Sequence, residues 1–125
     1  MEQASPDQVG GKLVAWDEQK LTLEAAAGTL SFPVKQVREI WRGSESEVAK
    51  ARAAVHFRRP TKAWEDRVLA GFPNAMSIPG VVAAEGGVPL AVDGQIIGAI
   101  GISGGTSAED GVIATTVIDT LKELV

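Results

Sequence analysis

A glycine-rich turn near the C-terminus has the composition of an anion-binding site, because it follows an apolar run and precedes a helical pattern. Backbone N–H groups in the first turn of a helix have no partner within the helix and can bind a carboxylate or a phosphate. The alternative is that Glu109 and Asp110 accept those hydrogen bonds themselves and repel an anion. The turn lacks the lysine of a P-loop, so both interpretations stay open. The candidate ligand-binding residues of this turn are Ser103, Gly104, Gly105 and Thr106.

His56 is the only histidine of the chain, and a neutral imidazole can ligate haem iron or act as a general base. It lies near the predicted end of a helix, where a histidine also interacts favourably with the helix dipole. We therefore treat His56 as a candidate haem ligand. With no cysteine and no second histidine, we expect no dedicated zinc or copper site.

Two further segments carry polar groups that could face a ligand. Arg58 and Arg59 could bind an acidic ligand through their guanidinium groups, or they could be surface charges at a helix end. Glu85 precedes Gly86 and Gly87, and this segment is either a simple turn or the edge of a cavity. No Ser/His/Asp set and no paired carboxylates stand out, so we expect no catalytic residues and regard an enzyme as the less favoured class.

The N-terminal part of the chain is predicted to form a small β-meander. Apolar residues alternate with polar ones over Lys12–Trp16, Lys20–Glu24 and Thr29–Val34, which predicts three strands. We expect a β-rich segment over residues 1–43, similar to an SH3 or Sm-like strand segment, and a composition break before Ser44. Residues 44–125 then form the second domain.

The second domain is predicted to alternate helices with one hairpin. Ser44 and Glu47 have the spacing of a capping box, and Pro60 ends the first helix. A second helix follows Thr61, which is expected to be its N-cap. The Asp93-Gly94 pair between two apolar runs predicts a hairpin of central strands that are buried on both faces.

The last helix is expected to start near Ser107, with Ser107 as its N-cap, and to end at Leu124. Its apolar residues give it a broad hydrophobic face. The residues expected to face the core are Val112, Ile113, Val117, Ile118, Leu121 and Leu124.

Length and charge narrow the class of protein. The chain has 125 residues and a net charge of −4, so counterion release would not favour nucleic acid as a partner. No apolar run is long enough for a membrane span, and no secretory signal is visible, so we expect no membrane partner and a cytoplasmic location. The absence of cysteine fits a reducing compartment.

Residues 46–124 resemble the GlcG/HbpS-like family, the haem-binding or haem-degrading domains that include the C-terminal domain of the PduO cobalamin adenosyltransferases. The segments that carry the resemblance are Lys50-Ala51-Arg52, Phe57-Arg58-Arg59-Pro60-Thr61, Pro79-Gly80, Gly86-Gly87-Val88-Pro89, Asp93-Gly94, Ile97-Gly98-Ala99-Ile100-Gly101, Ser103-Gly104 and Asp110.

The resemblance implies an α/β (α+β) fold with a profilin-like antiparallel sheet and flanking helices, preceded here by the β-meander. It also implies assembly into homo-oligomers, and binding of haem or a corrinoid in some members. Residues 1–43 do not show the helix and hairpin with which the family domain begins, so the domain looks truncated at its start. No residue matches the histidine that the resemblance would place in that opening helix, and His56 is not its equivalent.

The sequence therefore predicts a protein that binds a small ligand, with haem or a related tetrapyrrole or corrinoid as the implied cofactor. One alternative is an oligomeric interaction module without a cofactor. Another is an accessory protein of glycolate or diol metabolism, which rests only on the resemblance.

Overall fold

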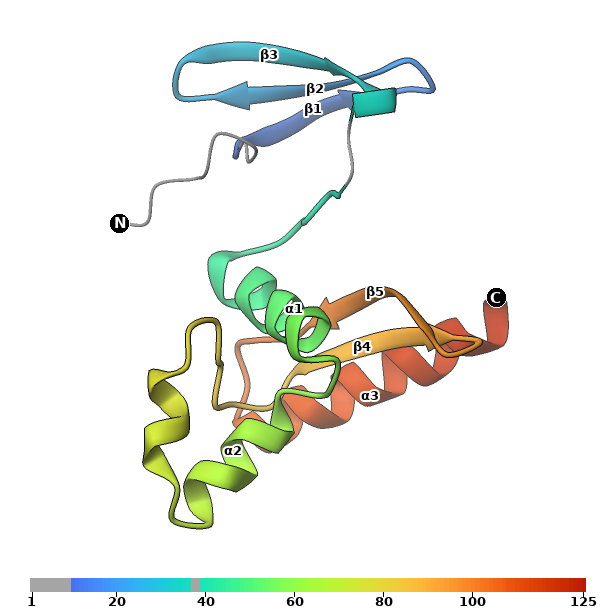
Figure 1. Cartoon of the computed structure of the whole chain (residues 1–125). Coiled ribbons are helices and arrows are strands. Elements are labelled where there is room, and N and C mark those ends of the chain that lie inside the picture. Colours follow the sequence, from blue (N-terminus) through green and yellow to red (C-terminus); the bar gives the residue numbers. More distant parts are fainter. Residues whose placement is uncertain (1–9, 37–38) are drawn as a thin grey trace. The chain divides into compact units, whose positions relative to one another are not determined.

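The computed structural model describes residues 10–36 and 39–125, and these residues fall into two compact units that divide between Ile40 and Trp41. The predicted N-terminal segment also included residues 1–9 and 37–38, which lie outside the described residues. Figure 1 shows the elements of each unit. The architecture is α+β with antiparallel sheets and flanking helices, as the sequence predicted.

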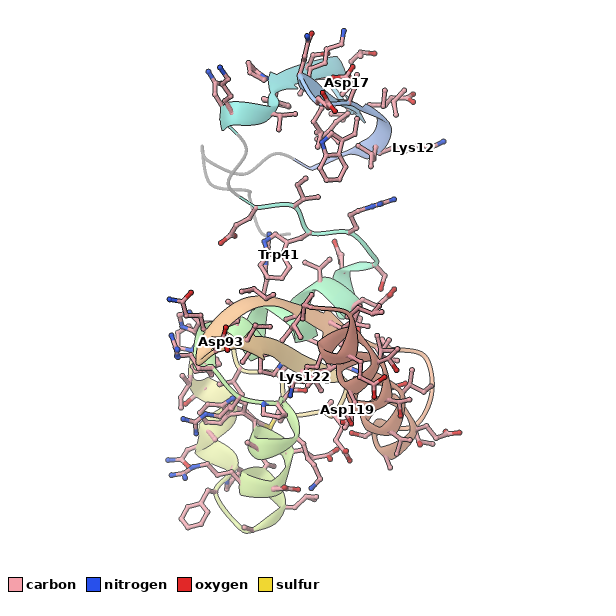
Figure 2. The ribbon with its side chains drawn as sticks, turned by 90° about the vertical axis from the view of Figure 1, so that its right-hand side faces the viewer. Lys12, Asp17, Trp41, Asp93, Asp119 and Lys122 are labelled. Carbon is pink, nitrogen blue, oxygen red and sulfur yellow. The ribbon has the colours of Figure 1, made fainter. Side chains whose placement is uncertain are left out.

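The first unit is a three-stranded antiparallel meander in the order β1-β2-β3. Its strands are β1 (Lys12–Trp16), β2 (Lys20–Ala25) and β3 (Gly28–Pro33), followed by the short 3-10 helix η1 (Val34–Gln36). The Asp17 carboxylate shapes the first turn, because its Oδ1 accepts hydrogen bonds from the N–H of Gln19 (2.8 Å) and Lys20 (2.9 Å). The hydrogen bond from Lys20, and after it the one from Gln19, lower the pKa of Asp17. Asp17 lies at this turn in Figure 2.

The second unit is built on the antiparallel hairpin of β4 (Gly87–Val92) and β5 (Gln95–Gly101). Asp93 and Gly94 both have positive φ, 51° and 77°, as the predicted turn requires. Asp93 marks the end of the hairpin in Figure 2. Helix α1 (Glu45–Phe57) lies on one face of the hairpin and α3 (Ser107–Leu124) on the other (Figures 1 and 2). The elements α2 (Lys62–Leu69) and η2 (Pro73–Ser77) lie between α1 and β4 in the sequence.

The prediction that the hairpin strands are central and buried on both faces is wrong for the described residues. β4 and β5 form a two-stranded sheet, so each has a free edge within the part of the chain that the structure describes. Among their residues only Gly87 is buried, and most of the apolar ones are half-buried. One helix on each face covers only part of each strand.

Of the three predicted helix N-caps, one is confirmed, one is shifted by a residue and one lacks its side-chain hydrogen bond. The predicted capping box of Ser44 and Glu47 is present at the start of α1. A second capping box starts α3, but its N-cap is Thr106 rather than Ser107. Thr61 precedes α2 as expected, yet its hydroxyl caps nothing, because its Oγ1 instead accepts a hydrogen bond from the N–H of Gly87 at 3.0 Å.

The core of the second unit is made mainly of small side chains. Its buried apolar residues are Ala51, Ala53, Ala54, Ala75, Ala114 and Ile118. Of the six α3 residues that were expected to face the core, only Ile118 is buried and Val117 is half-buried, whereas Val112, Ile113, Leu121 and Leu124 are exposed. The expectation was wrong because α3 has apolar residues on several sides and its smallest ones, Gly111 and Ala114, pack inward.

Candidate functional site

A buried ion pair joins α1 to the first turn of α3. Lys50 and Asp110 are only 5% and 3% exposed, and Lys50 Nζ lies 3.1 Å from Asp110 Oδ2. The same ammonium group donates a hydrogen bond to the carbonyl oxygen of Ile102 at 2.8 Å. The other carboxylate oxygen of Asp110 accepts the N–H of Gly105 at 3.0 Å. We call the group Lys50, Gly86, Ile102, Gly105 and Asp110 the lysine junction.

Nothing in the sequence pattern indicates that Lys50 is buried. A lysine is seldom fully buried without a partner, and the partner here lies 60 positions along the chain. Only the presence of Lys50 and Asp110 among the residues that carry the family resemblance could have pointed to them.

The turn at residues 103–106 is largely occupied by hydrogen bonds within the protein. Glu109 accepts the N–H of Thr106 at 3.0 Å, and Asp110 accepts the N–H of Gly105. The Ser103 hydroxyl lies 2.7 Å from the Ser46 hydroxyl of α1. The amides of Gly105 and Thr106 are therefore already paired with carboxylates, which is the arrangement that the sequence offered as the alternative to anion binding.

The predicted glycines at residues 86 and 87 allow close packing around the lysine junction. A Cβ on Gly86 would collide with the Ile102 carbonyl oxygen and lie 3.1 Å from Lys50 Nζ, and Gly86 has a φ of +123°. A Cβ on Gly87 would collide with the backbone carbonyl oxygen of Lys50. Glycine is therefore required at both positions, because a side chain would prevent this close contact between backbone segments.

Glu85 is connected to the start of α3, next to the lysine junction, by hydrogen bonds. Its N–H donates to Ser107 Oγ at 2.8 Å, and the Ser107 hydroxyl donates to Glu65 Oε1 at 2.6 Å. Its side chain lies against α3 so closely that a Cβ on Gly111 would collide with Glu85 Oε1. Glu85 is therefore half-buried and packed between elements.

The remaining predicted residues lie at the other end of α1, where aromatic and cationic side chains gather. The ring centroid of Phe57 is 4.6 Å from that of His56 and 4.9 Å from that of Trp64, and both contacts are edge-on. The Arg59 guanidinium lies 5.8 Å from the Trp64 ring centroid, which is within cation–π range. We call His56, Phe57, Arg58, Arg59 and Trp64 the histidine face.

Two features distinguish the histidine face from the lysine junction. His56, Arg58 and Arg59 are exposed. The indole Nε1–H of Trp64 is buried and donates to no acceptor among the described residues. A buried donor without an acceptor is unfavourable, so an acceptor group brought close to it would gain a hydrogen bond. Trp64 was not among the site residues predicted from the sequence.

The predicted site residues therefore separate into two groups. Glu85, Gly86, Gly87, Ser103, Gly105 and Thr106 meet around the lysine junction and the start of α3, with Gly104 in the same turn. His56, Arg58 and Arg59 lie at the far end of α1. His56 is six residues beyond Lys50, which corresponds to about 9 Å along a helix.

Two properties of the described residues bear on the kind of site. These residues contain no group of three or more His, Cys, Asp or Glu side chains that could hold a metal ion. None of their helices combines the length and the hydropathy that crossing a bilayer needs.

The fold and these two groups of residues define a small α+β domain. A family described as "Haem degrading protein HbpS-like" matches residues 25–119. The chain belongs to this family. The match begins upstream of residue 46, where the sequence resemblance was expected to start, and it includes β3 of the meander.

Sequence relatives match a shorter part of the chain. "Protein GlcG" of Escherichia coli is 50% identical over 54 residues, which is 43% of this chain. An uncharacterised 15.0 kDa protein of Citrobacter freundii is 43% identical over 44 residues, or 35% of this chain. The matches span only 40% and 31% of the length of these relatives.

Solved structures extend the likeness to the fold. The crystal structure of a PduOC–heme complex has a TM-score of 0.52 and 31% identity, and the match covers 74% of this chain and 68% of that one. A double mutant of HbpS from Streptomyces reticuli has a TM-score of 0.52 and 26% identity, with coverage of 75% and 64%. This chain is therefore similar to a protein solved with haem and to HbpS.

Proposed function

We propose that this chain binds haem, or another planar tetrapyrrole with carboxylate side chains, at the histidine face. The observation that carries the proposal is the exposed imidazole of His56 beside Phe57 and two arginines at the end of one helix. A haem site needs an axial ligand, an apolar surface for the ring and cations for the propionates.

The residues of the histidine face match these needs in their chemistry. His56 would supply the axial nitrogen, and Phe57 with Trp64 would supply the apolar contact. Arg58 is the C-cap of α1 with a φ of 57°, so the chain turns away from the helix axis at the first arginine. Arg58 and Arg59 would pair with the propionates, and bound haem would supply redox-active iron.

The family description and the haem complex of a structural relative support haem over other tetrapyrroles. The lysine junction has a structural role in this proposal, since its polar groups are paired with one another.

Titration with haemin tests the proposal. We expect the Soret band of haemin to shift and sharpen at micromolar protein, and His56→Ala to remove the shift while the far-UV circular dichroism stays unchanged. Ser103→Ala, in the glycine-rich turn beside Ser46 at the opposite end of α1, is the matched control and should bind as the wild type does. A free-haemin spectrum with the wild-type protein, or the same bound spectrum in His56→Ala, would contradict the proposal.

A further inference from the structure

The register of the hairpin shows which backbone groups of β4 and β5 point away from the ladder between them. The Ile102 N–H donates to the Gly86 carbonyl oxygen at 2.9 Å, so these two residues form a hydrogen-bonded pair. In an antiparallel ladder such pairs alternate with pairs whose backbone groups point outward, to the edges of the sheet. The next pair, Gly87 with Gly101, therefore points outward, and so does the pair two positions further along the ladder.

The outer edge of β4 is closed to a further strand. The carbonyl oxygen of Gly87 accepts the N–H of Thr61 at 2.9 Å, and the N–H of Gly87 donates to Thr61 Oγ1 at 3.0 Å. The next outward residue of β4 is Pro89, which has no N–H to donate. A covering loop and a proline are two of the features that keep an edge strand from pairing with another chain.

The outer edge of β5 has neither kind of protection. Its outward residues are Ala99 and Gly101, whose N–H and C=O groups have no hydrogen-bond partner among the described residues. The second unit has no third strand beside β5 in the part of the chain that the structure describes (Figure 1). β5 contains no proline and no charged residue, and its Ile97 side chain is 58% exposed. An apolar edge without such protection is a template for pairing with another strand.

The chemistry of the β5 edge selects an extended polypeptide segment as its partner. Ala99 and Gly101 are two residues apart, which is about 7 Å along a strand and is the spacing at which an added strand offers its own backbone groups. A helix uses these backbone groups internally and cannot offer them. Because β5 carries no charge, a charged side chain in the bound segment would lose hydration and gain no ion pair from this strand. The segment that fits is therefore extended and uncharged.

We propose that the outer edge of β5 binds an extended, uncharged segment of another protein as an additional strand of the sheet. The main-chain hydrogen bonds at Ala99 and Gly101 supply the affinity, as they do in other cases of strand addition. The closed edge of β4 directs the segment to β5. This site shares no residue with the histidine face, so it is independent of the proposed haem binding.

Amide hydrogen exchange of the full-length chain, measured by NMR with and without a model peptide, tests the proposal. The probe is a capped hexapeptide of alternating threonine and valine at millimolar concentration. We expect it to slow exchange at Ala99 and Gly101 by about 10-fold, because each N–H gains a ladder hydrogen bond, and to leave Gly87 unchanged. The same peptide with N-methyl groups on its edge-facing amides keeps its side chains but cannot donate, and it should have no effect.

A proline at the β5 edge is the matching change in the protein. Ala99→Pro should weaken peptide binding by at least about 10-fold, because it removes an outward N–H at a position where the ladder itself needs none. Ala91→Pro on β4 is the matched control and should bind as the wild type does. Ala91 lies next to the pair that closes the two-residue turn, so its backbone groups point to the edge that is already closed.

Three outcomes would overturn the proposal. One is unchanged exchange at Ala99 and Gly101 with the peptide present, and another is equal binding of the N-methylated peptide. The third is slow exchange at both amides without peptide, which would mean that this chain, or a second copy of it, already pairs with the edge. If circular dichroism shows that Ala99→Pro does not fold, the comparison of the two peptides on the wild type still decides. The haemin titration concerns other residues, so either proposal can fail alone.

Discussion

Lys50 and Asp110 stabilise the second unit only as a pair, because each is a charge removed from water. Their partners are the backbone of the strand end and of the glycine-rich turn, so the pair holds together segments from α1, β5 and α3. Burying two charges is costly, and the gain from pairing them offsets that cost only while both are present.

We therefore expect Lys50→Met to lower the free energy of unfolding by about 3–5 kcal/mol, because it leaves the Asp110 carboxylate buried without its cation. The double variant Lys50→Met/Asp110→Asn should lose less than the sum of the two single variants. Urea unfolding followed by circular dichroism measures both. Additive losses would show that the two side chains do not act together.

Gly86 is the second position where the residue type is dictated by its surroundings. We expect Gly86→Ala to destabilise the protein by at least ~2 kcal/mol, because the methyl group collides with the Ile102 carbonyl and φ is in the left-handed region. Gly98→Ala is the control and should be neutral or slightly stabilising, since its Cβ has open space. Thermal unfolding of the two variants would contradict this account if their midpoints changed equally.

At the scale of the elements, both long helices of the second unit begin with a capping box. Glu109 accepts the backbone N–H of Thr106, and this hydrogen bond, together with the Thr106 hydroxyl, lowers the pKa of Glu109. Glu47 at the start of α1 has a lowered pKa for a similar reason, through Ser44. A carboxylate whose pKa is lower in the folded than in the unfolded state stabilises the fold above the unfolded pKa and loses that effect as the pH falls through the folded pKa.

We therefore expect Glu109→Gln to make stability less dependent on pH between pH 6 and pH 3. The wild type should lose more free energy of unfolding on acidification than this variant does. Chemical denaturation at a series of pH values gives the comparison, with Glu123→Gln in the exposed last turn of α3 as the control. An identical acid dependence in wild type and Glu109→Gln would show that this cap contributes nothing.

The strands and turns could be predicted from the sequence because their signals are local. Alternating apolar residues placed β1 to β3 to within a residue or two, and the Asp93-Gly94 pair fixed the hairpin. The packing of α3 could not be predicted, because its apolar residues lie on several sides and periodicity alone does not say which side the sheet covers. The burial of Lys50 could not be predicted either, since it depends on its ion pair with Asp110 in another helix.

For the candidate site, the sequence named residues of both groups but could not tell that α1 separates them. His56, Arg58 and Arg59 were singled out by residue type, and the glycines by composition. Sequence alone could not decide whether the amides of the glycine-rich turn are free. In the structure Gly105 donates to Asp110 and Thr106 donates to Glu109.

At the scale of the whole molecule, the two units differ in how much core they have. Leu21 is the only buried residue among those described in the first unit, and a three-stranded sheet with so little core is expected to open easily. The second unit has a core from α1, the hairpin and α3.

We expect hydrogen exchange measured by mass spectrometry to show faster exchange in peptides from β2 and β3 than in peptides from β4 and β5. The reason is that the first unit can unfold locally without disturbing the core of the second. Equal protection in both sets of peptides would instead indicate that the chain unfolds as one cooperative unit.

The central claim is that the ligand binds at the histidine face and not at the lysine junction. Titration of isotope-labelled protein with gallium protoporphyrin, a diamagnetic analogue of haem, maps the contact through amide chemical shifts. The account predicts the largest shifts at residues 56–64 and in the segment around Gly80, where an added Cβ would lie 3.8 Å from Phe57 and 4.0 Å from His56, with little change at residues 103–107. Shifts centred on residues 103–107, with His56 and Trp64 unaffected, would contradict it.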